Sequence, residues 1–108
     1  LGLVSGSPLV EIKKILPGKM LKLFTSVVAG NQVKNGKPHP EPYLRAARLL
    51  GLAPGACLVI ENAPFGITSA KKAGMPCIAV LTSLPKEYLT AADLVVESLS
   101  QITGLIPL

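Results

Sequence analysis

The sequence predicts an α/β fold in which helices cover both faces of a mainly parallel sheet. Two observations support this class. Short apolar runs alternate along the chain with segments of helical periodicity, as they do in successive βαβ units. The runs also lack polar alternation, which is typical of strands that are covered on both faces. We therefore expect residues 1–108 to form a single domain.

The chain should open with a strand over 1–4, because LGLV is apolar throughout. Ser7 and Pro8 follow it, and these residue types favour the N-cap and the first position of a helix. That helix should end near Pro17, because proline cannot continue a helix.

A second strand is expected over 24–30, with a long polar loop over 31–40 after it. Prolines begin the next helix, and Gly51 should end it by adopting the positive φ of a helix C-terminus. The remaining expected elements are a strand over 56–60, a helix over 64–75 that Gly74 ends, a strand over 76–80 and a short strand over 93–96.

The composition and net charge indicate which kinds of ligand the chain can bind. Hydrophobic residues make up 49% of the chain and charged residues 16%, which argues against disorder. No apolar stretch approaches the roughly 20 residues of a membrane helix, so no membrane association is expected. The net charge of +5 favours anionic ligands. Nucleic acid is not the expected anion, because the few aromatic residues form no stacking row among the basic ones.

The two cysteines indicate structural rather than chemical roles. Cys57 and Cys77 each begin an apolar run, in neither a C-x-x-C nor a zinc-binding spacing. We expect small buried free thiols. Free thiols suit a reducing compartment, so the expected location is cytoplasmic.

Polar residues follow three of the expected strands, at ends that lie along one edge of a parallel sheet, where ligands bind. Ser5 offers a hydroxyl, and the N–H groups of Gly6 and Ser7 at a helix N-terminus suit a phosphate group. The alternative is a serine that only caps the helix.

Lys37 follows Gly36 and precedes Pro38, a setting that restricts the backbone and leaves one cation to point at a ligand. A nucleotide-binding P-loop is not expected, because Pro38 stands where that motif has Ser or Thr. His39 lies between two prolines, and we expect it to be an exposed loop residue.

Glu61 and Asn62 follow the expected strand over 56–60. Glu61 is a candidate ligand for Mg²⁺, which binds carboxylates together with waters and phosphate oxygens. Asn62 can add its amide oxygen. The alternative is that Asn62 only holds the turn before Pro64.

In chain order, VSGS, GKPHPEPYLRAARLLGL and CLVIENAPFGITSAKKAGMPCIAV resemble the haloacid dehalogenase superfamily, in particular its β-phosphoglucomutase and phosphoglycolate phosphatase branch. The resemblance covers nearly the whole chain. It implies a Rossmann-like three-layer α/β/α core domain. It also implies a Mg²⁺-dependent phosphatase or phosphomutase that acts on a small phosphorylated metabolite.

The resemblance assigns roles to the predicted site residues. Ser5, with the N–H of Gly6, matches the motif that binds the transferring phosphoryl group. Lys37 matches the catalytic lysine that neutralises charge on that group. Glu61 and Asn62 match the acidic pair that helps hold Mg²⁺. Asn62 replaces the usual Asp, and this change should weaken Mg²⁺ binding.

One family motif has no match in these residues. It reads D-x-D-x-T, ends the family's first strand and supplies the nucleophile and the general acid and base, whereas the single Asp of this chain is Asp93. The cap region that shapes substrate choice is also unmatched. The resemblance thus implies the C-terminal part of the core, without its first strand and inactive alone. A preceding segment or another chain would then fill the open central edges of the sheet, or the two edges would close on each other. The alternative is a non-catalytic phosphate-binding or interaction module.

Overall fold

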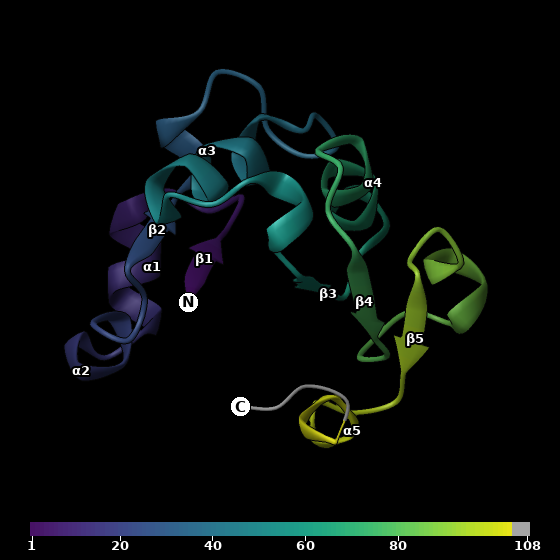
Figure 1. The fold of residues 1–108 in the computed structure, drawn as a ribbon. Coiled ribbons are helices and arrows are strands. Elements are labelled where there is room, and N and C mark those ends of the chain that lie inside the picture. The colour runs from purple at the N-terminus through teal and green to yellow at the C-terminus, as the bar shows by residue number, and fades with distance from the viewer. Residues whose placement is uncertain (105–108) are drawn as a thin grey trace.

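The computed structural model of the protein describes residues 1–104, so the last four residues of the predicted domain lie outside the described part. Strands and helices alternate along the chain, which confirms the α/β class (Figure 1). The elements are β1 (Gly2–Val4), α1 (Leu9–Ile15), α2 (Gly18–Leu21), β2 (Ser26–Val28), α3 (Glu41–Leu50), β3 (Val59–Glu61), α4 (Pro64–Lys72), β4 (Cys77–Val80), β5 (Leu94–Val96) and α5 (Ser100–Thr103). Short 3-10 helices span Gly30–Gln32, Pro54–Ala56 and Lys86–Leu89.

All the strand pairs are parallel, as predicted, but they form two sheets rather than one. β1 pairs with β2, and the second sheet has the order β3-β4-β5. β1 and β3 are therefore edge strands of different sheets, and they do not pair with each other within residues 1–104. The division falls at the place where the resemblance puts the missing first strand.

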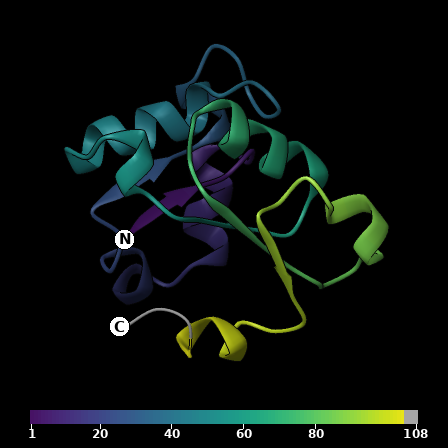
Figure 2. The same cartoon turned by 45° about the vertical axis from the view of Figure 1, so that its right-hand side comes forward.

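The side chains of β4 alternate between two cores. The larger core lies between the second sheet and the helices α3 and α4, and its buried members are Tyr43, Ala47, Val59, Ile67, Ala70, Ala73, Met75, Cys77, Ala79 and Leu89. The smaller core joins the opposite face to α5 through Ile78, Val80, Val96 and Ile102. Figure 2 shows α4 and α5 on either side of this sheet. β4 is covered on both faces, as its unbroken apolar sequence predicts.

β3 departs from that expectation. Val59 and Glu61 point into the structure and are buried, whereas Ile60 between them is 46% exposed. The prediction of a strand covered on both faces is wrong for β3, because its second face borders an open cavity.

The predicted start of the first helix needs correction, whereas its predicted end is confirmed. The N-cap of α1 is Pro8, without a side-chain cap, and not Ser7. The N–H of Leu9, in the first turn of α1, donates to Asn31 Oδ1 at 3.1 Å, so a residue from a later loop provides the acceptor expected from Ser7. The N–H of Ser7 donates to Ser5 Oγ at 3.0 Å in a local turn. α1 ends at Ile15, near Pro17 as expected, and Pro17 is the N-cap of the separate one-turn helix α2.

The glycine predictions are confirmed. Gly51 has a φ of 70° directly after α3, and Gly74 has a φ of 80° after α4. These conformations are strained for residues with a Cβ. Both cysteines are free, with Cys77 buried and Cys57 half-buried. In the described part of the chain, no helix has the length and apolar character to cross a membrane.

Candidate functional site

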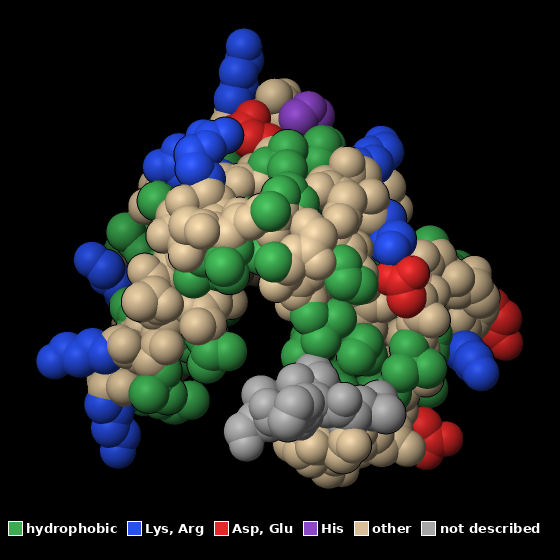
Figure 3. Space-filling model, viewed as in Figure 1, with side chains coloured by type: hydrophobic (Ala, Val, Ile, Leu, Met, Phe, Trp, Pro, Cys, Tyr) green, Lys and Arg blue, Asp and Glu red, His purple; other side chains and the backbone are tan. Residues whose placement is uncertain are grey.

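A cavity of about 690 Å³ lies between the edge of β1 and the edge of β3. Figure 3 shows it as a hollow between the two halves of the molecule. Apolar side chains from both sheets and from α3 form much of its wall. The predicted site residues that line it are Ser5, Gly6, Lys37, Glu61 and Asn62. Residues from three separate loops therefore meet at one place, as the sequence analysis expects.

The turn after β1 packs against Gly30. A Cβ at that position would overlap the backbone of Gly6, so a glycine is needed for this close approach. The hydroxyl of Ser5 accepts the N–H of Ser7, and Ser7 stands back from the cavity wall. The structure thus brings Ser5 and Gly6 to the cavity but not Ser7.

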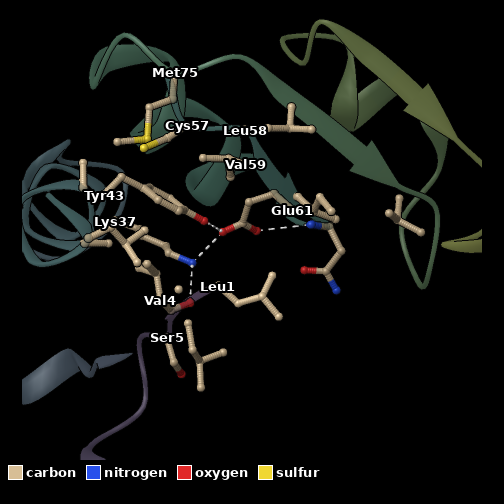
Figure 4. A pocket seen from close by; sticks show the side chains of 18 of the residues that line it. Leu1, Val4, Ser5, Lys37, Tyr43, Cys57, Leu58, Val59, Glu61 and Met75 are labelled. Carbon is tan, nitrogen blue, oxygen red and sulfur yellow. Dashed lines mark hydrogen bonds and ion pairs between the residues drawn. The ribbon is translucent and has the colours of Figure 1, made fainter. Parts of the chain in front are cut away.

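Glu61 is the buried charge at the centre of the site (Figure 4). Only 7% of its side chain is exposed. Its Oε1 atom accepts hydrogen bonds from Lys37 Nζ at 2.5 Å and from the hydroxyl of Tyr43. Its Oε2 atom accepts the N–H of Asn62 at 3.1 Å. A buried carboxylate needs such partners, because an isolated one loses its hydration without compensation.

Helix α4 supports the Glu61 carboxyl group from behind. A Cβ at Gly66 would overlap all three atoms of that group, so the carboxylate packs directly on the helix backbone. The sequence analysis did not identify Gly66 as a site residue. The available signal was a glycine near the start of a predicted helix, where this residue type costs helix stability unless another contact requires it.

Lys37 joins the ends of the two sheets. Besides Glu61, its Nζ atom lies 3.4 Å from the carbonyl oxygen of Val4, at the end of β1. The same atom lies 5.2 Å from the centre of the Tyr43 ring, which suits a cation–π contact. The side chain remains 20% exposed, on the cavity side. One ammonium group can therefore contact both sheets and an anion in the cavity.

The loop that carries Lys37 is tied down at its two ends. The carboxylate of Glu41 accepts the N–H of Lys34 at 2.7 Å and the N–H of Asn35 at 3.2 Å. The hydrogen bond from the N–H of Lys34 contributes most, and together these bonds hold the pKa of Glu41 below its usual range. His39 is exposed, as predicted, and its carbonyl oxygen accepts the hydroxyl of Ser69 on α4 at 2.7 Å.

Tyr43 is a site residue that the sequence analysis missed. It lies at the start of α3, is 7% exposed and directs its hydroxyl to Glu61. Burial, and then the hydrogen bond to Glu61, raise the pKa of Tyr43, so its hydroxyl stays a proton donor. An aromatic residue on the buried face of a helix is ordinarily a core residue, and the sequence pattern does not reveal its hydrogen bond.

The described residues fit part of a Mg²⁺ site. Glu61 Oε2 is available on the side away from Lys37, and Asn62 donates its amide to Thr82 Oγ1 at 3.1 Å, which leaves its carbonyl oxygen for a cation. No group of three or more His, Cys, Asp and Glu side chains with metal-binding geometry occurs among residues 1–104. Because Mg²⁺ prefers six oxygen ligands in octahedral geometry, further ligands would have to come from water, phosphate or another carboxylate.

Comparison with known proteins decides the family. Residues 1–80 match the family model described as haloacid dehalogenase-like hydrolase. The chain belongs to this family. Hexitol phosphatase A of Escherichia coli is 49% identical to it over 76 residues, which cover 70% of this chain and 35% of that protein. Phosphoglycolate phosphatase of the same organism is 36% identical over 81 residues, 74% of this chain and 32% of that protein.

The fold agrees with the sequence match. The crystal structure of a candidate β-phosphoglucomutase from Thermotoga maritima superposes with a TM-score of 0.86 and 34% identity, over 98% of this chain and 53% of that one. This haloacid dehalogenase-like chain therefore spans about a third of those curated relatives and about half of that structural neighbour. The resemblance inferred from the three sequence segments is confirmed.

Proposed function

We propose that the chain forms the phosphate-binding and metal-binding part of a phosphatase or phosphomutase that acts on a small phosphorylated metabolite. One observation carries the proposal: Lys37 Nζ lies at the carboxyl ends of β1 and β3, beside a cavity that Ser5 also lines. The E. coli relatives are phosphatases by name, and phosphoglycolate is a small phosphorylated acid.

Each residue at the cavity has a chemical role in this proposal. The Ser5 hydroxyl and the Gly6 N–H bind phosphoryl oxygens, and Lys37 offsets the charge that develops on them. Because only 20% of the Lys37 side chain is exposed, water screens its charge less than it would at a fully exposed position. Glu61 keeps the ammonium of Lys37 at the strand ends when no anion is bound.

A bound Mg²⁺ would supply charge stabilisation and orient the phosphoryl group. Glu61 Oε2 and the amide oxygen of Asn62 are the ligands that this chain would contribute. Asn62 brings no charge, so we expect weaker binding than with a carboxylate at this position.

In its described part, residues 1–104, the chain places no carboxylate where it could attack phosphorus, since Glu61 alone among their carboxylates lines the cavity. Asp93, its only aspartate, accepts the N–H of Cys77 at 2.8 Å and pairs with Lys71 at 2.7 Å. Cys77 begins β4, so Asp93 lies at the amino ends of the strands, opposite Lys37 and Glu61. The Glu61 carboxylate already accepts hydrogen bonds from Lys37, from Tyr43 and from the N–H of Asn62. We infer that turnover requires a carboxylate from elsewhere.

The open edges of β1 and β3 suit a strand that would bring this carboxylate. Parallel edge strands leave backbone donors and acceptors that a further strand can pair with. A preceding segment or another chain could occupy this place. A cytoplasmic location remains a prediction that fits the free cysteines.

Asn62 favours a second candidate, a phosphate-binding or interaction module that has lost catalysis. It replaces a metal-binding charge in a chain that also lacks the nucleophile motif. A transcript that encodes a D-x-D-x-T segment in frame with this chain would argue against the module.

The proposal is tested by phosphate binding and hydrolysis on the purified 108-residue chain. We expect Lys37→Ala to weaken binding of inorganic phosphate, measured by calorimetry, by at least about tenfold, as loss of a charged hydrogen bond predicts. His39→Ala is the matched control, since His39 lies outside the cavity wall. Equal effects of the two changes would show that Lys37 is not the phosphate ligand.

We also expect no hydrolysis of p-nitrophenyl phosphate with Mg²⁺ or with EDTA. Metal-dependent turnover that survives repurification and disappears in Lys37→Ala would show that a residue of this chain attacks phosphorus. The inference of a nucleophile from elsewhere would then be wrong.

A further inference from the structure

Glu61 holds two side-chain donors on the same oxygen atom. Lys37 and Tyr43 both donate to Oε1, while Oε2 accepts only a backbone N–H among the described residues. The two donors differ in mobility. Lys37 reaches the site from a loop on a flexible side chain, whereas Tyr43 is part of α3 and its ring is packed in the larger core.

This arrangement matters because one ammonium group serves two anions. A phosphate in the cavity and the Glu61 carboxylate compete for Lys37. If Lys37 were the only donor to Oε1, its movement toward phosphate would leave a buried carboxylate oxygen unpaired. Such an unpaired charge is costly, so Lys37 would stay with Glu61 and the phosphate would bind weakly.

We propose that Tyr43 is a positioning residue that keeps Glu61 hydrogen-bonded while Lys37 turns from Glu61 to the phosphoryl group. The inference rests on the proposed function and adds a residue to it. The neutral hydroxyl has no attraction to a second partner that would draw it away from the carboxylate. By occupying Oε1, it also leaves Oε2 facing Asn62, on the side where a cation would bind.

Packing of the aromatic ring does not require the hydroxyl group of Tyr43. A phenylalanine would fill the same space in the core and would keep the cation–π contact with Lys37. Only the hydroxyl reaches Glu61. Tyr43→Phe therefore removes the proposed role and retains the packing, and Tyr88→Phe is its matched control because Tyr88 is exposed and lies outside the cavity wall.

The first measurement needs no phosphate. Limited acetylation of the whole chain with acetic anhydride, read by mass spectrometry, gives the reactivity of Lys37 relative to the exposed Lys34. Acetylation needs a nitrogen lone pair that the reagent can reach, and Lys37 cannot offer one while it donates to Glu61. We expect Tyr43→Phe to slow acetylation of Lys37 by about tenfold, since a hydrogen bond to a charged group contributes on the order of 1.5–3 kcal/mol. Tyr88→Phe should change nothing.

A purely structural role predicts the opposite sign, because a loosened site would expose Lys37 and speed its acetylation. An unchanged or faster reaction in Tyr43→Phe overturns the proposal. If Tyr43→Phe does not fold, 3-fluorotyrosine incorporated at both tyrosines decides the question. Its hydroxyl is a stronger donor, so Lys37 should react faster relative to Lys34, and an unchanged or slower reaction overturns the proposal.

The second measurement is the affinity for inorganic phosphate. We expect Tyr43→Phe to weaken it by about tenfold with Lys37 and Ser5 both present. An unchanged affinity overturns the proposal. If the unaltered chain does not bind phosphate while the Lys37 reactivity falls as expected, the proposed function fails and the role of Tyr43 toward Glu61 stands.

Discussion

The ends of β1 and β3 face the same cavity but hold their polar residues in different ways. Glu61, at the end of β3, is buried, accepts three hydrogen bonds and packs against the backbone of α4. Gly6, after β1, has open space where a Cβ would lie, and the hydroxyl of Ser5 holds only a local turn. The carboxylate is thus fixed before any ligand binds, whereas the turn after β1 keeps room for one.

The largest effect on this difference is expected when a methyl group is added beside each strand end, at Gly66 near β3 and at Gly6 after β1. Gly66→Ala should destabilise the chain by about 1–3 kcal/mol, because the new Cβ overlaps the Glu61 carboxyl group between two packed elements. Gly6→Ala is the matched control and should change stability by less than about 0.5 kcal/mol, since nothing lies within 4 Å of its Cβ position.

Urea unfolding followed by circular dichroism measures both variants. Comparable destabilisation by the two changes would show that the two strand ends are equally constrained. The contrast between a fixed carboxylate and an open turn would then be lost.

A smaller effect is expected from restoring a charge beside Glu61. Asn62→Asp adds a carboxylate next to Oε2, and we expect Mg²⁺ to bind about tenfold more tightly, because carboxylates are the ligands that Mg²⁺ prefers. Calorimetric titration with MgCl₂ measures this change. Asn31→Asp adds the same charge at the exposed residue whose side chain accepts the N–H of Leu9, and it should leave Mg²⁺ affinity unchanged.

Equal gains in the two variants would mean that Mg²⁺ responds to net charge and not to a site at the end of β3. A gain confined to Asn62→Asp would mean that the fixed carboxylate at the end of β3 belongs to a cation site.

The smallest effect concerns the opposite end of the second sheet. The hydrogen bonds from Lys71 and then from the N–H of Cys77 hold the pKa of Asp93 below its usual range. A carboxyl group with a lowered folded-state pKa stabilises the protein above its unfolded-state pKa of about 4, and this stabilisation is lost as the pH falls through the folded-state pKa. Asp93→Asn should therefore melt slightly lower at neutral pH.

Thermal unfolding of both proteins between pH 7 and strongly acidic pH measures the difference, which should shrink as the pH falls. Because Asp93 is exposed, we expect it to be smaller than the effect of Gly66→Ala. A constant difference across this range would mean that the Asp93 charge does not stabilise the fold.

The order of elements and several residues of the cavity wall followed from the sequence. The apolar runs predicted the strands, and Gly51 and Gly74 predicted where helices end, because these signals act over a few residues. The short helices α2 and α5, each of four residues, were not expected, since one turn is too short to show a period. The expectation that Ser7 caps α1 failed because Pro8 is the N-cap and the side chain of Asn31, from a later loop, accepts the N–H of Leu9.

The sequence by itself determined which polar groups end the strands, because parallel strands bring their carboxyl ends to one edge whatever their packing. Ser5, Glu61 and the loop that carries Lys37 could be placed at that edge in this way, and their roles toward a ligand stay predictions. Only the tertiary structure decided that Tyr43 and Gly66 serve the same carboxylate and that the strands divide into two sheets around a cavity. Those facts depend on contacts between segments far apart in the chain, and no local pattern of residues records such contacts.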